Sequence, residues 1–378
     1  MKIGIYNKYW STCGGGEKHV GAIAQHLASS DKVDLISNTR FSIADLESKL
    51  NLNLANCIEV ILPNHTEEMM EEFSANYDLW INSTFLSSMR SKAKTSILLV
   101  FFPFLDTALR LLWKKLPVIQ PEWLQKFFWR KYGFWNTYDI VVSNSEFTKS
   151  WVQKWWKCES FVLPPPIDLF EMLQDHPKKK IILSVGRFFV GGHNKKQDVM
   201  IKAFIQMIKT HNCTGWHYHV CGGTHPEKVH QDYLQQLTQM SEGYPITIHP
   251  DIDRNSLVEL YYDAKIFWHA TGYGESDVKS PEVMEHFGMT TVEAMSAGCI
   301  PIVINKAGQK EVIKHGVNGF VWDNLDDLYT LSIAVMSSAD VGSIMAKARS
   351  TSQKYAVAEF NRSLVTLMQK ISPSAPQR

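Results

Sequence analysis

The sequence predicts an α/β protein of two Rossmann-like domains that face each other across a cleft. Three observations predict this fold. Short apolar runs alternate with helical patterns in both halves of the chain, which is typical of parallel sheets covered by helices on both faces. Three consecutive prolines, Pro164–Pro166, interrupt the alternation, and such a run fits a connector but no helix or central strand. The length of 378 residues is sufficient for two separate cores.

The first half of the chain reads as buried strands with helices between them. The predicted strands are Ile3–Tyr6, Val33–Ser37, Ile58–Leu62, Leu79–Asn82, Ile97–Phe101 and Ile140–Ser143. Helices are predicted at Glu17–Ser29 and Thr66–Ser74. Buried strands that alternate with helices indicate a mostly parallel sheet. Residues 1–172 are therefore assigned to an N-terminal Rossmann-like domain.

The same alternation begins again after the prolines. The predicted strands are Ile181–Val185, Trp216–Cys221, Ile246–Ile248, Ile266–His269 and Ile300–Ile304. The predicted helices are Lys195–Lys209, Pro226–Met240, Asn255–Tyr262, Thr290–Ala297 and Gln309–His315. Residues 173–350 are assigned to the second domain, and 351–378 to a helix that packs back toward the first. Sheets of this kind bind ligands at the C-terminal ends of their strands.

Composition narrows the class of protein. Hydrophobic residues make up 45% and charged residues 20%, as in ordinary globular proteins, and the net charge of +1 gives no reason to expect a nucleic-acid partner. The cysteines are scattered without metal-ligand spacing, which favours a reducing cytoplasm over a disulfide framework. The N-terminus lacks the apolar core of a signal peptide. The apolar stretch Ser96–Trp113 is too interrupted for a membrane span. We expect a cytoplasmic protein.

The segment from Glu285 to Pro301 carries two glutamates, Glu285 and Glu293, separated by seven residues. Between them, a glycine turn leads into a predicted helix through Phe287, Gly288, Met289 and Thr290. Such a helix N-terminus exposes unpaired amides and a partial positive charge, which suit a diphosphate. Glu293 would then accept hydrogen bonds from ribose hydroxyls, and Glu285 would face a sugar beyond the diphosphate. By spacing alone, the more common interpretation is that both are surface carboxylates on helices.

This segment resembles the E-x7-E motif of the family 4 retaining glycosyltransferases, in which the second glutamate opens a Glu-Ala-Met-x-Ala-Gly run as Glu293 does. The resemblance covers nearly the whole C-terminal half, including Ser184–Phe188, Lys195–Ile201 and Gly316–Phe320. It implies the GT-B fold, a nucleotide-diphosphate sugar bound by the second domain, and an acceptor on the side of the first. It also implies that Glu285 is a catalytic-site residue that contacts the transferred sugar.

Two cations agree with this resemblance. Arg187 follows a strand and Lys195 opens a helix, so both can converge on one diphosphate and stabilise it as the leaving group. The link between them is longer than is usual in the family, so Lys196 stays an alternative to Lys195; both cations also fit a solvated surface. His269, at a strand end, is expected to contact a donor phosphate or the base, or else to be a hydrogen-bonded core histidine.

The N-terminal half supplies fewer candidates. In the family that the chain resembles, the glycine loop that holds Gly15 and Gly16 closes near the donor phosphates; a plain tight turn is the alternative. Many relatives carry a histidine after the strand that corresponds to Ile97–Phe101, and it is absent here. Asp106 is the nearest titratable candidate for a catalytic base. A front-face displacement, in which the donor phosphate takes the acceptor proton, needs no such base.

No metal and no cofactor besides the nucleotide sugar are expected. No Asp-x-Asp motif lies in a suitable loop, and two cations with a helix N-terminus can replace a divalent ion electrostatically. We therefore predict sugar transfer to an acceptor hydroxyl with retention, in lipid-linked glycan or polysaccharide assembly. A non-catalytic nucleotide- or carbohydrate-binding protein on the same scaffold, and a transferase with a soluble acceptor, stay open as alternatives. The base, the sugar and the acceptor are not determined.

A last feature concerns the acceptor. Residues 110–135 combine six basic residues with one acid and many aromatic side chains. Aromatic residues with basic neighbours suit the headgroup region of an anionic membrane. We predict that the first domain docks there, at the inner face of a membrane, to reach a lipid-linked acceptor. The alternative is that these aromatic side chains fill the core of the domain.

Overall fold

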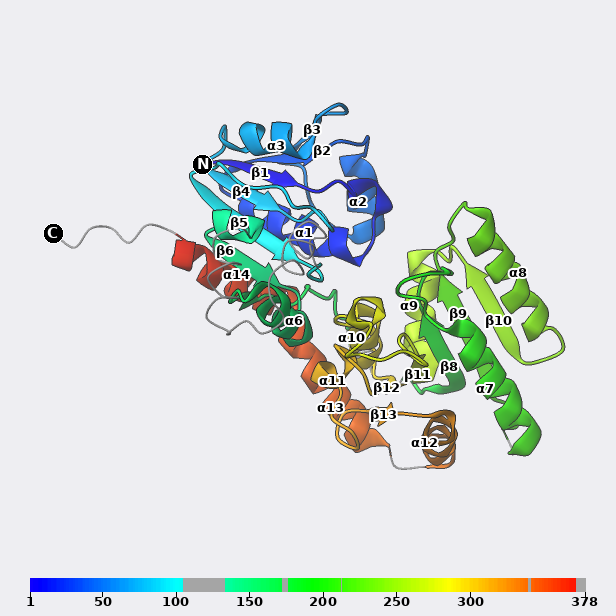
Figure 1. Ribbon diagram of the computed structural model, residues 1–378. Helices are drawn as coiled ribbons and strands as arrows, with labels where there is room; N and C mark the ends of the chain where they lie inside the picture. Colours follow the sequence, from blue (N-terminus) through cyan, green and yellow to red (C-terminus); the bar gives the residue numbers. More distant parts are fainter. Residues whose placement is uncertain (105–132, 172–175, 212, 339–340, 372–378) are drawn as a thin grey trace, which may run out of the picture. The chain divides into compact units, whose positions relative to one another are not determined.

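The computed structural model describes residues 1–104, 133–171, 176–211, 213–338 and 341–371. The chain forms two compact units (Figure 1). Unit 1 comprises Met1–Pro166 and Val357–Arg378, and unit 2 comprises Ile167–Ala356. Each unit is built around one parallel sheet with helices packed on it. Asp106 and most of the basic aromatic stretch lie outside the described residues.

The sheet of unit 1 has the order β3-β2-β1-β4-β5-β6-β7, and every pairing is parallel. Its strands are β1 (Lys2–Tyr6), β2 (Lys32–Ser37), β3 (Cys57–Ile61), β4 (Leu79–Asn82), β5 (Thr95–Val100), β6 (Ile140–Ser143) and β7 (Phe161–Val162). Its described helices of more than one turn are α1 (Gly15–Leu27), α2 (Ile43–Leu50), α3 (Glu67–Ser74), α6 (Glu146–Trp156) and α14 (Val357–Ile371). Strand β4 shows why the runs are continuously apolar: Leu79 and Ile81 enter one core cluster, and Trp80 enters the cluster on the opposite face.

Unit 2 repeats this plan with the order β10-β9-β8-β11-β12-β13, again parallel throughout. Its strands are β8 (Lys179–Val185), β9 (His217–Gly222), β10 (Ile246–Pro250), β11 (Ala264–His269), β12 (Ile300–Ile304) and β13 (Phe320–Trp322). Its described α-helices are α7 (Gln197–Thr210), α8 (Lys228–Ser241), α9 (Arg254–Asp263), α10 (Met289–Ser296), α11 (Gln309–Val312), α12 (Leu325–Ser337) and α13 (Gly342–Ser352). In both sheets the strand order reverses beside the first strand, between β1 and β4 and between β8 and β11.

The structure draws the unit boundaries differently from the predicted 172/173 and 350/351. Ile167 is buried in a core cluster of unit 2, and its amide donates to the carbonyl of Tyr355 at 2.8 Å. The chain therefore enters and leaves unit 2 along two adjacent segments. Helix α14 then packs Phe360, Leu364 and Leu367 into the core of unit 1.

Two aromatic residues of the predicted membrane-binding stretch are core residues. Phe134 and Trp135 are buried, and the Trp135 ring stacks on Trp156 at 4.7 Å between centroids. The prediction is wrong for these two, because they pack against the sheet of unit 1.

The six cysteines are all free thiols. Among the described residues, no single helix is long and apolar enough to cross a membrane, although the bent pair Leu325–Ser337 and Gly342–Tyr355 would pass on length and composition.

Candidate active site

The polar side chains of unit 2 gather where the strand order reverses, at the C-terminal ends of β8 and β11. Arg187 comes two residues after β8, and His269 is the last residue of β11. Lys195 precedes helix α7, and Glu285 precedes helix α10. Parallel α/β sheets bind ligands at this switch point, because the flanking loops separate there.

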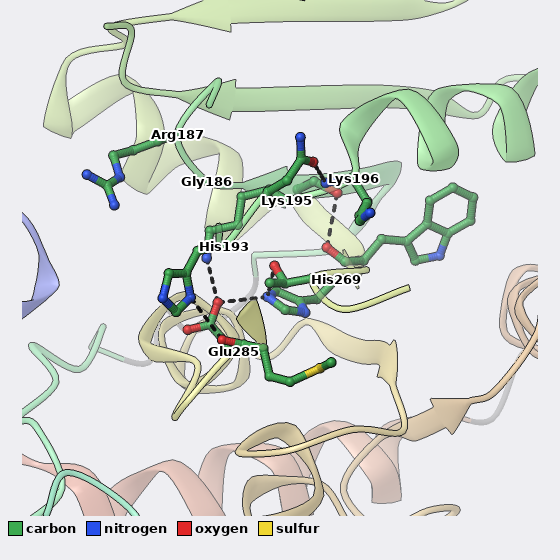
Figure 2. A network of polar contacts seen from close by, with 12 residues as sticks. Gly186, Arg187, His193, Lys195, Lys196, His269 and Glu285 are labelled. Atoms are coloured by element: carbon green, nitrogen blue, oxygen red, sulfur yellow. Dashed lines mark hydrogen bonds and ion pairs between the residues drawn. The ribbon is translucent and has the colours of Figure 1, made fainter. Parts of the chain in front are cut away.

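Glu285 is the centre of this group. Its Oε2 accepts a hydrogen bond from Lys195 Nζ at 2.5 Å and lies 3.2 Å from His269 Nε2. Figure 2 shows both side chains pointing at the carboxylate. The side chains of Lys195 and Glu285 are 21% and 20% exposed, so a ligand can reach the ion pair. The ring of His269 is buried and contacts the carboxylate from the interior of the unit.

The charges of the network follow from its contacts. Burial by itself would raise the pKa of Glu285, but the Lys195 ammonium and the His269 hydrogen bond hold it well below its ordinary value. Burial lowers the pKa of His269, and it outweighs the attraction to Glu285. A carboxylate, an ammonium and a neutral imidazole therefore coexist at neutral pH. The imidazole then donates its Nε2–H to the carboxylate, which only accepts.

The structure distinguishes the two adjacent lysines. The ammonium of Lys196 lies 3.5 Å from Glu275, and its amide donates to the side chain of Asn194 at 2.6 Å. Lys195 is thus the lysine that lies at Glu285, while Lys196 points to a different carboxylate.

Arg187 is an exposed cation on the β8 turn. The side-chain amide of Gln197 donates to the carbonyls of Gly186 and Arg187, at 3.0 and 3.1 Å, and so fixes this turn against the start of α7. The guanidinium lies 5.8 Å from the ring centroid of Phe189. Within the described part of the chain it has no acidic partner, which leaves it available to an anion.

The predicted glycine turn stands at the start of α10. Gly288 is the N-cap with φ 103°, and a Cβ there would lie 2.4 Å from Gln309 Nε2, so the turn requires glycine. The amides of Met289 and Thr290 are the first of the helix and have no intrahelical acceptor. The Phe287 side chain is buried against Tyr355, so only its backbone is left for a ligand.

Glu293 has different partners, all from helix α9. Its Oε2 accepts from the hydroxyl of Tyr261 at 2.9 Å, and Arg254 Nη1 lies 3.4 Å from Oε1. Burial raises the pKa of Glu293, and it outweighs the lowering by Arg254 and the Tyr261 hydrogen bond. Tyr261 and Arg254 are site residues that the sequence did not predict.

Gly15 and Gly16 lie in unit 1 and form the first turn of α1. The predicted start of this helix at Glu17 is wrong, because Glu17 is its third residue and caps it: Glu17 Oε2 accepts from the amide of Gly14 at 2.9 Å. The same oxygen accepts from Thr12 Oγ1 at 2.6 Å. The glycines therefore belong to a capped helix start.

One group in the described ranges has the composition of a metal site. His225, Glu227 and His230 place their ligand atoms within 4.8 Å of one another. However, the amide of Val190 donates to His230 Nδ1 at 3.0 Å. That bond occupies the Nδ1 lone pair and keeps the proton of the neutral ring on Nε2, which lies 3.6 Å from Glu227. His230 thus has no free lone pair for an ion, and we assign no metal to this group.

Comparison with known proteins gives matches in both sequence and structure. Residues 168–338 match the family model described as Glycosyl transferases group 1. The chain is 25% identical over 205 residues to the GDP-Man:Man(3)GlcNAc(2)-PP-Dol alpha-1,2-mannosyltransferase of Dictyostelium discoideum, over 50% of this chain and 38% of that protein. It is 30% identical over 209 residues to the alpha-1,3/1,6-mannosyltransferase ALG2 of Saccharomyces cerevisiae, over 48% and 41%. The chain therefore spans less than half the length of these relatives.

Solved structures match over nearly the whole chain. A glycosyltransferase from Rickettsia africae has a TM-score of 0.71 at 14% identity, and the match covers 99% of each chain. Anabaena Alr3699/HepE in complex with UDP also has a TM-score of 0.71, at 15% identity, over 98% of this chain and 100% of that one. Similarity at this level of identity shows the fold alone. It confirms the predicted GT-B class.

Proposed function

This chain belongs to the family 4 glycosyltransferases, with its group 1 domain at residues 168–338, and on that premise we propose that it transfers a sugar from a nucleotide diphosphate to an acceptor hydroxyl with retention of configuration. The observation that carries the proposal is the Lys195–Glu285–His269 network at the switch point of unit 2, with Arg187 on the neighbouring turn. The cations Arg187 and Lys195 suit the diphosphate of the donor, and the fixed carboxylate of Glu285 suits the sugar that is attached to it.

Each residue has a role that its contacts support. Arg187 and Lys195 bind the diphosphate, together with the first amides of α10, and stabilise it as negative charge develops on departure. Glu285 binds hydroxyls of the transferred sugar. Glu293 binds the ribose, since a carboxyl that is held by Tyr261 and only partly exposed has a fixed direction. In a front-face displacement the departing phosphate takes the proton of the acceptor hydroxyl.

The ion pair has a consequence for donor binding. Without a ligand, Lys195 is neutralised by Glu285. A diphosphate competes for the same ammonium, and its arrival releases the carboxylate toward the sugar. Donor binding and the orientation of Glu285 are thereby coupled.

We further propose that a divalent metal is dispensable, since two cations and a helix N-terminus supply the charge that a metal would. Activity that EDTA abolishes and Mg²⁺ or Mn²⁺ restores would contradict this.

The acceptor is proposed to be lipid-linked, because a relative's name specifies a dolichol-linked substrate and residues 110–132 are rich in basic and aromatic residues. Sedimentation with anionic liposomes tests it: no binding at low salt would leave a soluble acceptor.

The function itself is tested by incubating the protein with GDP-mannose and with UDP-glucose. Release of the nucleoside diphosphate, including slow hydrolysis, is measured with Glu285→Gln as the inactive control. Once a compound is found to which the sugar is transferred, NMR of the product gives the anomeric configuration of the new glycosidic bond. Turnover of one donor is expected; tight binding of a nucleotide sugar with no turnover would instead indicate a binding protein on a transferase scaffold.

A further inference from the structure

We propose that His193 is a third ligand of the donor diphosphate and takes up a proton as the nucleotide sugar binds; this rests on the function proposed above. His193 lies in the link between β8 and α7, which carries Arg187 at its start and Lys195 at its end. From the sequence, this link stands out only because it is longer than is usual in the family.

The link is held in one path by bonds on both sides of His193. The amide of Phe188 donates to the carbonyl of Gly223 at 3.0 Å, and the amide of Val190 donates to His230 Nδ1 at 3.0 Å. The Asn194 side chain accepts from the amide of Lys196. His193 itself has φ 62°, in the left-handed region that a non-glycine residue rarely occupies. Strain of this kind persists where neighbouring contacts impose it, often at ligand sites.

The hydrogen bond of the ring defines its tautomer. His193 Nδ1 lies 2.9 Å from the carbonyl oxygen of Met284, the residue before Glu285. A carbonyl only accepts, so Nδ1 carries the hydrogen and Nε2 carries the lone pair of the neutral ring. No described residue forms a hydrogen bond with Nε2, and Figure 2 shows the ring beside the Glu285 carboxylate. The ring also packs edge-on against His286, at 4.7 Å. A proton can therefore be added at Nε2 without breaking an existing bond.

The charged groups around His193 give the direction of the linkage. Burial lowers its pKa, and the Lys195 and Arg187 cations lower it further, whereas Glu285 and the Met284 carbonyl raise it. His286, also packed against the ring, is buried and neutral, with its pKa lowered to about 3. The free site thus holds a neutral His193 at pH 7. A diphosphate on Arg187 and Lys195 offsets both cations and offers an anionic acceptor to a protonated Nε2, so it raises the pKa.

The sign of the pH dependence follows. Since the pKa of His193 is higher in the complex than in the free protein, binding takes up a proton and affinity increases as pH falls. The increase occurs between the two pKa values and is at most about tenfold per pH unit. Above the pKa of the complex, the contribution of His193 is lost.

The test is isothermal titration calorimetry with whichever of GDP-mannose and UDP-glucose binds. These donors are used because a free nucleoside diphosphate titrates near pH 6 itself. Titration at pH 7 in two buffers of different ionisation enthalpy measures the protons taken up. Wild type is expected to take up a substantial fraction of a proton, and His193→Gln none. His211→Gln, which removes an exposed histidine at the end of α7, is the matched control and is expected to behave like wild type.

Donor binding by wild type without proton uptake, and with unchanged affinity in His193→Gln, would overturn the inference and leave the proposed function intact. Absence of binding by any nucleotide sugar would instead overturn the function and the inference with it. If the variant does not fold, the ¹⁵N shifts of the wild-type imidazoles decide: a ring of the Nδ1–H tautomer that becomes charged when donor is added supports the inference, and no such change overturns it.

Discussion

The two units have the same strand order around their first strand, yet the groups at their switch points differ. In unit 1, the residue after β1 is Asn7, whose side chain donates to Glu17 at 3.2 Å; the carboxylate of Glu17 also accepts from Thr12 and from the amide of Gly14. The hydrogen bonds of the Glu17 carboxylate are therefore all made to residues of the loop between β1 and α1. In unit 2, the turn after β8 presents Arg187 with no acidic partner among the described residues. The fold places a loop at the switch point of each sheet, and the side chains on that loop determine whether it can bind a ligand.

The largest effect is expected from Glu285→Gln. Turnover should fall by at least about a hundredfold. Glutamine is uncharged, so it can no longer stabilise the positive charge that develops on the sugar in the transition state. Nucleotide-sugar affinity should fall only a little, because the weaker contact with the sugar is offset by the loss of the internal competitor for Lys195. Separate measurement of kcat and Kd checks this. A proportional loss of both would mean that Glu285 supports the site structurally.

Arg187→Ala comes next. A charge-assisted hydrogen bond contributes about 1.5–3 kcal/mol, so nucleotide-sugar affinity should fall by roughly 10- to 100-fold while nucleoside affinity stays close to wild type. Lys202→Ala, an exposed lysine on α7 paired with Asp198, is the matched control. Equal loss for nucleotide sugar and nucleoside would contradict a role at the phosphate.

The glycine turns of the two units can be compared by stability. Gly288→Ala combines positive φ with a 2.4 Å contact to Gln309, and it should lower the free energy of unfolding by about 1–3 kcal/mol. Gly16→Ala lies in a helix, with a 3.2 Å contact to the Phe101 ring, and should change it by less than about 1 kcal/mol, because alanine favours the helix. Urea unfolding measures both. A larger loss at Gly16 would reverse the comparison.

The smallest effect on donor binding is expected from Glu17→Gln in unit 1. The amide oxygen of glutamine can still accept from Gly14, but its amide nitrogen would face the donating amide of Asn7, so the free energy of unfolding should fall by about 1–3 kcal/mol. Nucleotide-sugar affinity should stay unchanged, because Glu17 is buried within its own loop. A tenfold loss of affinity would show that the switch point of unit 1 also takes part in donor binding.

Much of the fold was predictable from the sequence, since buried parallel strands read as apolar runs. β4, β6 and β12 begin and end where the pattern predicts. The short strand β13 was missed because three residues carry too little pattern. Helix α12 was also missed, although Asn324 and Asp327 form a capping box at its start.

The candidate site was predictable in part. Arg187, Lys195 and His269 stand at strand or helix ends, where a parallel sheet brings them together, and Glu285 precedes a glycine turn. Which of the two lysines, Lys195 or Lys196, lies at Glu285 was not predictable, because it depends on the path of the preceding link. His193 was missed for the same reason: its partner, the carbonyl of Met284, lies far away in sequence.

The most direct test of the account is nucleotide-sugar binding by Lys195→Ala and Lys196→Ala. The two residues are adjacent and chemically identical, yet Lys195 contacts Glu285 and Lys196 contacts Glu275. Isothermal titration should show affinity reduced at least about tenfold for Lys195→Ala and within about twofold of wild type for Lys196→Ala. Wild-type affinity in Lys195→Ala, or an equal loss in both variants, would contradict the claim that the switch point of unit 2 holds the donor diphosphate.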